Sequence, residues 1–238
     1  MTNALRTCAG KKPRQFRRLR KGPEATLQLT VQSQLDDLFP LAGKPTWTAG
    51  SVPLGAGVPD ILRTAFEPEI LHLADVDATS IAMVAYLRTV GRARKETIAA
   101  KVGGVQLIDQ RLAVLIDANI VVANRGLCSL TERWRSVLPE VMSIEVKVAD
   151  WRKALSQAAR NRIFSNMSYV ALPKSLASRI QYEAGFTSLG IGLLGVEGDE
   201  VIIMRRARRI KPRAWNYYYM IASLAADELA GADRVVQH

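Results

Sequence analysis

A glutamate and a lysine two positions apart, Glu145 and Lys147, lie in the short β-branched segment 144–148. Side chains alternate between the faces of a strand, so these two would project from one face while Ile144 and Val146 project from the other. Metal-assisted chemistry can use such a pair, because the carboxylate binds a hard divalent cation and the amine holds a water or a developing negative charge. The tripeptide is common, however, and it also describes an exposed strand with a Glu–Lys ion pair. The surrounding elements must decide between the two interpretations.

The composition of the 238-residue chain is compatible with a catalytic domain, since 48% hydrophobic residues can fill one large core or two small ones. A formal net charge of +11 and a pI of about 10 indicate a polyanionic partner, either nucleic acid or an anionic membrane surface. No apolar run is long enough to span a bilayer and no signal peptide is recognisable, so we expect a nucleic-acid partner and no membrane.

The cysteine and histidine content bears on the cellular compartment and on zinc binding. Cys8 and Cys128 are too few for a disulfide framework and predict a cytoplasmic protein. His72 and His238 give no Cys/His ligand spacing, which argues against a zinc site.

Two parts of the chain have α/β character. Residues 24–38 predict an amphipathic helix, and residues 45–55 and 56–62 predict two strands joined by a turn, with Asp60 in the second. Beyond residue 140 the patterns predict a strand at 143–148, a helix at 150–164, a strand at 168–172, a helix at 174–184, a hairpin at 189–204 and a helix at 213–229.

The intervening segment has a different pattern. It predicts helices at 77–90, 95–104 and 106–118, followed by a hairpin at 120–131 that turns at residues 124–126. Three helices and a β-wing resemble a winged helix-turn-helix domain. The phrase LAVLIDANIVVANRGLCSLT is similar to the last helix, wing and closing strand of bacterial regulators of that class.

The order of the α/β elements resembles that of the PD-(D/E)XK, or restriction-endonuclease-like, nuclease superfamily. A helix and a strand precede the strand bearing Pro59-Asp60, and the strand bearing Glu145-x-Lys147 is followed by a helix and a strand. The phrases VPLGAGVPDIL and SIEVKVADWRKALSQAARNRIFSNMSYVALP are similar to the two halves of such a core, over about residues 25–70 and 140–205. The resemblance implies an α/β (α+β) fold in which helices flank a mixed sheet.

Asp60 and Glu145 are unusually far apart in sequence for this superfamily, so we interpret the winged-helix segment as an insertion between two adjacent strands. The ends of a hairpin loop lie close together, and a compact inserted domain adds little closure entropy. The expected organisation is a basic tail at 1–24, core segments at 25–70 and 140–238, and the insertion at 71–139. A competing interpretation uses Asp75 or Asp77 as the acidic partner, or treats the halves as unrelated domains.

The resemblance implies roles for individual residues. Asp60, Glu145 and the main-chain carbonyl of Val146 would bind Mg²⁺ or Mn²⁺, and Lys147 would orient the attacking water. Gln157 occupies the helix position where related enzymes place a glutamine near the site. Many members also carry a glutamate on the first helix, whereas residues 32–37 contain none. Either Gln32, Gln34 or Asp36 substitutes for it, or metal binding is weaker, which leaves a degenerate nuclease as an alternative.

Several basic and amide side chains could contact DNA. In the insertion these are Arg92, Arg94, Lys95, Gln110, Arg111 and Arg125, and after the hairpin they are Arg205, Arg206, Arg208 and Arg209. The second group could instead be a solvated strand edge. The block of lysines and arginines at 11–21 either docks on phosphates or is a solubilising tail. The aromatic residues 215–219 could stack bases, although their helical spacing is more typical of a core.

We therefore expect a metal-dependent DNA endonuclease that hydrolyses phosphodiester bonds, with an association to defence or repair. The alternative is a non-catalytic DNA-binding or adaptor protein with a degenerate nuclease core. The winged helix could bind DNA or a protein partner, and a homo-oligomer is compatible with the sequence.

Overall fold

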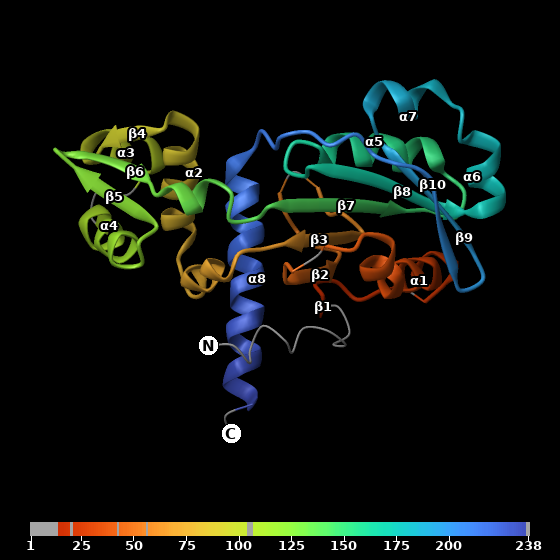
Figure 1. Cartoon of the computed structure of the whole chain (residues 1–238), viewed down its shortest axis with the longest axis horizontal. Coiled ribbons are helices and arrows are strands. Elements are labelled where there is room, and N and C mark those ends of the chain that lie inside the picture. Colours follow the sequence, from red (N-terminus) through yellow and green to blue (C-terminus); the bar gives the residue numbers. More distant parts are fainter. Residues whose placement is uncertain (1–13, 20, 42, 56, 104–106, 237–238) are drawn as a thin grey trace. The chain divides into compact units, whose positions relative to one another are not determined.

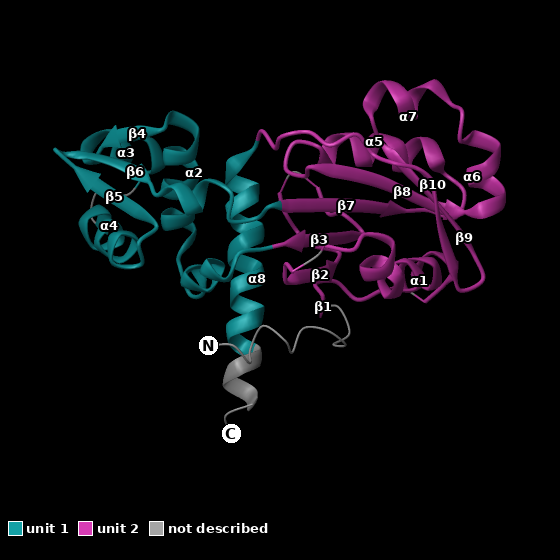
Figure 2. Cartoon of the chain, in the orientation of Figure 1, with its two compact units in different colours: residues 1, 66–139, 214–238 teal, residues 2–65, 140–213 magenta. Residues whose placement is uncertain are grey.

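The computed structural model describes residues 14–19, 21–41, 43–55, 57–103 and 107–236. The chain divides into two compact units (Figures 1 and 2). Within the described residues, unit 1 contains residues 66–139 and 214–236, and unit 2 contains residues up to 65 and 140–213. Residues 66–139, which include the expected insertion at 71–139, thus lie in one unit with the C-terminal segment, which the sequence assigns to the core.

Unit 2 is built on a seven-stranded mixed sheet. In spatial order its strands are β1 (Arg14–Gln15), β2 (Thr46–Gly50), β3 (Ile61–Ala65), β7 (Glu140–Val146), β8 (Met167–Pro173), β9 (Gly192–Glu197) and β10 (Glu200–Arg205). The pairs β2–β3, β3–β7 and β9–β10 are antiparallel, whereas β1–β2, β7–β8 and β8–β9 are parallel. A mixed α/β fold with a mixed sheet is thus confirmed.

Helices cover both faces of this sheet (Figure 1). On one face α1 (Pro23–Leu38) packs through Val31 and Leu35 against Ile144 and Val146 of β7. On the other face lie α5 (Trp151–Asn161), α6 (Lys174–Ile180) and α7 (Ala184–Leu189), whose core contains Leu155, Val170 and Phe186. The period of two along β7 therefore separates Ile144 and Val146 from Glu145, as the sequence predicts.

Two boundaries that position the candidate site differ from expectation. β7 begins at Glu140 and ends at Val146, so Lys147 lies just after the strand rather than within it. β3 begins at Ile61, so Asp60 immediately precedes the strand instead of lying inside it. The strand pairing ends there because Ser51, which follows β2, has a φ of 54° and leaves the extended conformation, although its N–H still donates to the Asp60 carbonyl at 3.0 Å.

The elements after β8 also differ slightly from the prediction. The single helix expected at 174–184 is two helices, α6 and α7. The expected hairpin is β9 and β10, which turn at Gly198 with φ of 57°.

The described residues of unit 1 form four α-helices, two short 3-10 helices (Pro68–Leu73 and Glu132–Arg135) and a small antiparallel sheet. The α-helices and strands are α2 (Ala78–Val90), β4 (Arg92–Arg94), α3 (Lys95–Val102), α4 (Ile108–Asp117), β5 (Val121–Asn124), β6 (Leu127–Leu130) and α8 (Trp215–Val236), with sheet order β4-β6-β5. The hairpin turns at Arg125 and Gly126, both with positive φ, where the sequence predicts the turn. The short strand β4 is not among the strands that the sequence predicts.

Helix α8 belongs to unit 1 rather than to the sheet unit with which the sequence groups it. Two buried tyrosines fix it there. Tyr218 Oη accepts a hydrogen bond from Leu138 N at 2.7 Å, and Tyr219 Oη donates to the Trp134 carbonyl at 2.5 Å. These rings are core residues, and burial raises the pKa of both hydroxyls. No helix in the described part of the chain is both long and apolar enough to cross a bilayer.

Candidate active site

Asp60, Glu145 and Lys147 meet where β3 begins and β7 ends. Asp60 Oδ2 accepts a hydrogen bond from Val146 N at 2.8 Å and another from Lys147 Nζ at 3.2 Å. The antiparallel register pairs Ile61 with Ile144, so the residues flanking this pair are held side by side by the sheet itself. Two widely separated sequence segments thus supply one cluster of charged groups.

Glu145 is almost fully buried, with 1% of its surface exposed. Its Oε1 accepts a hydrogen bond from Asn161 Nδ2 at 2.6 Å, whereas its buried Oε2 has no hydrogen-bond partner among the described residues. Burial and the neighbouring Asp60 carboxylate raise the pKa of Glu145 to about 8, while the Asn161 hydrogen bond and the Lys147 charge act in the opposite direction. The neutral acid is therefore favoured unless another positive charge compensates the carboxylate.

Lys147 connects the acidic residues. Its Nζ donates to the Val146 carbonyl at 2.8 Å and to Asp60, and it lies 3.8 Å from Glu24 Oε2. The side chain is mostly buried, with 14% exposed. This ammonium group is held in place by oxygen atoms from two strand ends and one helix, so its position is well defined.

Helix α1 contributes two residues that sequence reasoning misses. Glu24, in the first turn after Pro23, lies beside Lys147, and Gln28, one turn later, donates to the Asp60 carbonyl at 2.7 Å. The resemblance directs attention to residues 32–37, which lie further along the same helix. The available signal is Pro23-Glu24 itself, because a proline followed by an acid is typical of a helix N-terminus.

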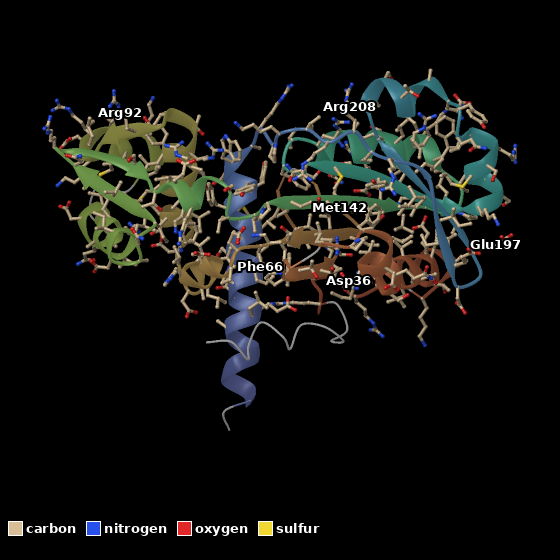
Figure 3. All side chains as sticks on the ribbon, in the orientation of Figure 1. Asp36, Phe66, Arg92, Met142, Glu197 and Arg208 are labelled. Atoms are coloured by element: carbon tan, nitrogen blue, oxygen red, sulfur yellow. The ribbon has the colours of Figure 1, made fainter. Side chains whose placement is uncertain are left out.

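The residues considered as substitutes for a helix glutamate have other partners. Gln32 accepts a hydrogen bond from Gln15, and Gln34 accepts one from Val201 N. Asp36, labelled in Figure 3, forms an ion pair with the buried Arg63 at 2.9 Å. None of the three forms a hydrogen bond with the side chains of Asp60, Glu145 or Lys147 in these interactions.

Helix α5 reaches the cluster through Asn161 rather than through Gln157. Gln157 is half-buried, and its Oε1 has no hydrogen-bond partner among the described residues. Asn161 lies one turn further on and donates directly to Glu145. The two positions share a helix face because they are four residues apart.

A cavity of about 240 Å³ opens beside the cluster. Its lining includes Arg17, Arg18, Glu24, Gln28, Asp60 and Val146. Glu145 does not line it, consistent with its burial. The cavity therefore presents acidic and basic side chains together at the ends of β3 and β7.

The residues can supply a small oxygen ligand set. Asp60 and Glu145 offer carboxylate oxygens, and Val146 offers a carbonyl. Within the described residues, no group of three or more His, Cys, Asp or Glu side chains is arranged as a metal site. Any cation here would therefore depend on main-chain oxygen and water for further ligands.

The competing acidic residues are used elsewhere in unit 1. Asp77 caps α2 by accepting from Ser80 N at 2.7 Å, and it pairs with Arg111 at 2.7 Å. Asp75 has a φ of 64°, and its main-chain N donates to Asp227 at 3.0 Å. Neither interaction involves the Glu145 cluster.

No protein-family model, curated protein or solved structure matches this chain.

The arginines that follow β10 have two kinds of surroundings. Arg205 donates to Thr187 Oγ1 at 2.9 Å and to the Gln181 carbonyl at 2.6 Å, and Arg209 pairs with the buried Glu140 at 2.8 Å. Arg206 and Arg208 are exposed, and Figure 3 labels Arg208 on this segment. The run is therefore partly structural and partly available to a ligand.

Arg208 belongs to a local cluster of positive charge. Burial lowers the pKa of Arg162 at the end of α5, and the charges of Arg208 and Arg213 lower it further. Guanidinium groups that repel one another in this way gain from a bound anion.

The candidate DNA-binding residues of unit 1 also fall into two groups, those in ion pairs and those that are exposed. Lys95 pairs with Asp109 at 2.8 Å, and Arg111 pairs with Asp77. Gln110 on α4 and Arg125 at the hairpin turn are exposed, as are Arg92 and Arg94 on β4, the first of which Figure 3 labels. Lys95 and Arg111 thus already have acidic partners, whereas the exposed residues remain candidates for DNA.

Proposed function

We propose that this chain is a metal-dependent DNA endonuclease of the PD-(D/E)XK, restriction-endonuclease-like superfamily. The observation that carries the proposal is the convergence of Asp60 with Glu145 and Lys147 at adjacent ends of β3 and β7. The element order α1, β2, β3, β7, α5, β8 supports it, because the superfamily core has the same order.

Asp60, Glu145 and the Val146 carbonyl would hold Mg²⁺ or Mn²⁺. The unpartnered Oε2 of Glu145 and the raised pKa of this carboxyl group fit such a ligand, since a cation would compensate both the burial and the Asp60 charge. When bound, the cation would polarise the phosphodiester and offset its negative charge.

The other side chains would position the reacting groups. Lys147 would hold the attacking water or a phosphate oxygen through its ammonium group and stabilise charge that develops at phosphorus. Glu24, whose Oε2 lies 3.8 Å from Lys147 Nζ, would help to hold the ammonium group at the site. Asn161 would fix the orientation of the Glu145 carboxylate through its hydrogen bond to Oε1.

The middle segment of unit 1 would be an inserted winged-helix domain, with α4 as its third helix and β5–β6 as its wing. A protein partner for this domain is favoured by one observation. α4 exposes Val114 at 56% and Ile116 at 38%, whereas its Arg111 and Asp109 already form ion pairs. Exposed aliphatic side chains on a helix are more useful in a protein interface than in a DNA groove.

The competing function is a non-catalytic DNA-binding or adaptor protein with a degenerate core. The small carboxylate set in the described residues and the existing Lys147–Asp60 ion pair favour it, because both weaken cation binding.

Incubation of the purified protein with plasmid, linear duplex and single-stranded DNA separates the two functions. Each substrate is incubated with Mg²⁺, Mn²⁺ or EDTA. The nuclease should cleave at least one substrate with a divalent cation and none in EDTA. DNA binding without cleavage under every condition would favour the adaptor.

A further inference from the structure

The N-terminal basic segment is attached to the sheet unit next to the candidate site. β1 pairs in parallel with β2, with Arg14 opposite Ala49 and Gln15 opposite Gly50. Phe16 N continues the pairing by donating to the Gly50 carbonyl at 3.0 Å. The expectation of a tail at 1–24 therefore does not hold for residues 14–16, which pair with β2, or for residues 23–24, which begin α1. Residues 1–13 and 20 lie outside the described residues.

Glutamine side chains fix the same segment to α1. Gln15 Nε2 donates to Gln32 Oε1 at 3.0 Å, and Gln28 Nε2 lies 3.5 Å from Gln15 Oε1 and 2.7 Å from the Asp60 carbonyl. Gly50 makes room for this packing, since a Cβ there would lie 1.9 Å from Gln15 Oε1. Gln15 is thus connected to Asp60 through Gln28.

The next two residues, Arg17 and Arg18, are exposed and line the cavity that also contains Glu24, Asp60 and Val146. The acidic residues of this cavity already face Lys147, at 3.2 Å from Asp60 and 3.8 Å from Glu24. A ligand complementary to this cavity must place anionic oxygen atoms near the arginines. It must also bind a cation or an ammonium group near the carboxylates. A phosphodiester has that chemistry, because its anionic oxygens bind guanidinium groups and divalent cations alike.

We propose that Arg17 and Arg18 form a phosphate-binding subsite of this cavity, which holds the backbone of a nucleic-acid strand beside Asp60 and Lys147. The inference rests on the proposed function, and it names residues outside the Asp60–Glu145–Lys147 cluster as determinants of substrate binding. Guanidinium–phosphate contacts give affinity without reading bases, so the subsite binds strands of any sequence.

Equilibrium binding in EDTA tests the subsite separately from catalysis. A labelled oligonucleotide duplex and its single strand are titrated with wild type and with Arg17→Ala/Arg18→Ala over a range of salt concentrations. For each phosphate that the variant no longer neutralises, the slope of log affinity against log salt should fall by roughly 0.9 on the duplex and roughly 0.7 on the single strand. Arg17→Lys/Arg18→Lys keeps both charges and should retain the salt slope, while its affinity falls because lysine cannot bind phosphate in the bidentate geometry.

The matched control is Arg160→Ala/Arg179→Ala, which removes two exposed arginines from α5 and α6. Its salt slope should differ from that of wild type by less than the change expected for the loss of one phosphate contact. Equal slopes for the two alanine double variants would overturn the subsite. The melting-temperature rise with Mn²⁺ should be unchanged in Arg17→Ala/Arg18→Ala, because the subsite binds phosphate rather than the cation.

The salt slopes, together with the cleavage assay described above, distinguish the two proposals. A reduced slope in a protein that never cleaves DNA would support the subsite and overturn the nuclease. Cleavage by a protein whose slope does not depend on Arg17 and Arg18 would support the nuclease and overturn the subsite.

Discussion

The main-chain N–H of Val146 donates a hydrogen bond to the carboxylate of Asp60 at 2.8 Å, across 86 positions of sequence. This bond fixes Asp60 at the end of β7, next to Glu145 and Lys147. It also leaves the carboxylate of Asp60 close enough to Glu145 to raise the pKa of the latter. Burial of Glu145 and the neighbouring Asp60 charge together therefore favour the protonated form of Glu145.

The first prediction concerns stability and pH in EDTA. The pKa of Glu145 is raised from 4.5 to about 8, so between these values the unfolded chain has released a proton that the folded protein keeps. The free energy of unfolding of wild type should therefore decrease as the pH rises through this window. Glu145→Gln removes the titrating carboxyl group and keeps an oxygen that can accept the hydrogen bond from Asn161. The stability of this variant relative to wild type should therefore increase with pH, by as much as about 4 kcal/mol above pH 8.

Urea unfolding of both proteins at pH 5, 7 and 9 measures this difference. A constant difference between wild type and Glu145→Gln across that range would show that Glu145 titrates normally.

The second prediction concerns Asn161. Asn161→Ala removes the hydrogen bond to Glu145 and should cost about 1–3 kcal/mol of stability, with the larger loss above pH 8 where the carboxylate is charged. Ser156→Ala, an exposed position on the same helix, is the control and should cost little at any pH. The urea midpoint against pH gives the measurement. A pH-independent loss of stability in Asn161→Ala would mean that the side chain supports α5 and not Glu145.

The third prediction concerns metal binding. Mg²⁺ or Mn²⁺ should raise the melting temperature of wild type, more strongly at pH 8 than at pH 6, because the ligands must lose their protons. Asp60→Asn should reduce the rise, whereas Asp37→Asn, exposed on α1, should not. Equal responses in the two variants would exclude Asp60 as a ligand.

The fourth prediction separates the arginines after β10. Arg206→Ala/Arg208→Ala should not lower stability, and it should reduce the salt slope of DNA binding by roughly 0.9 for each phosphate that the pair neutralises. Arg205→Ala removes two hydrogen bonds and should instead cost about 1–3 kcal/mol of stability. Thermal melts and binding isotherms of the same preparations distinguish these effects. Were Arg206→Ala/Arg208→Ala to keep the wild-type slope, this exposed pair would be a solvated surface.

Local sequence patterns predict two features well, one at the candidate site and one in unit 1. Alternation along residues 144–146 places Glu145 on the opposite face from Ile144 and Val146, and the turn at Arg125 and Gly126 follows from residue types alone. Both features depend on neighbours in the chain, and local patterns carry that information.

The interactions made across the fold are harder to predict. Glu24 and Asn161 reach the cluster because α1 and α5 pack on opposite faces of the sheet, and no local pattern encodes that long-range packing. The assignment of α8 to unit 1 depends on Tyr218 and Tyr219 finding main-chain partners at residues 134–138, again a long-range match.

Cleavage of supercoiled plasmid by wild type, Glu145→Ala and Lys147→Ala with Mn²⁺ tests the central claim most directly. A nuclease site at this cluster predicts nicking or linearisation by wild type, and no activity in either variant although each keeps its DNA affinity in EDTA. Undiminished cleavage by a well-purified Glu145→Ala protein would contradict the assignment of this cluster as a nuclease site.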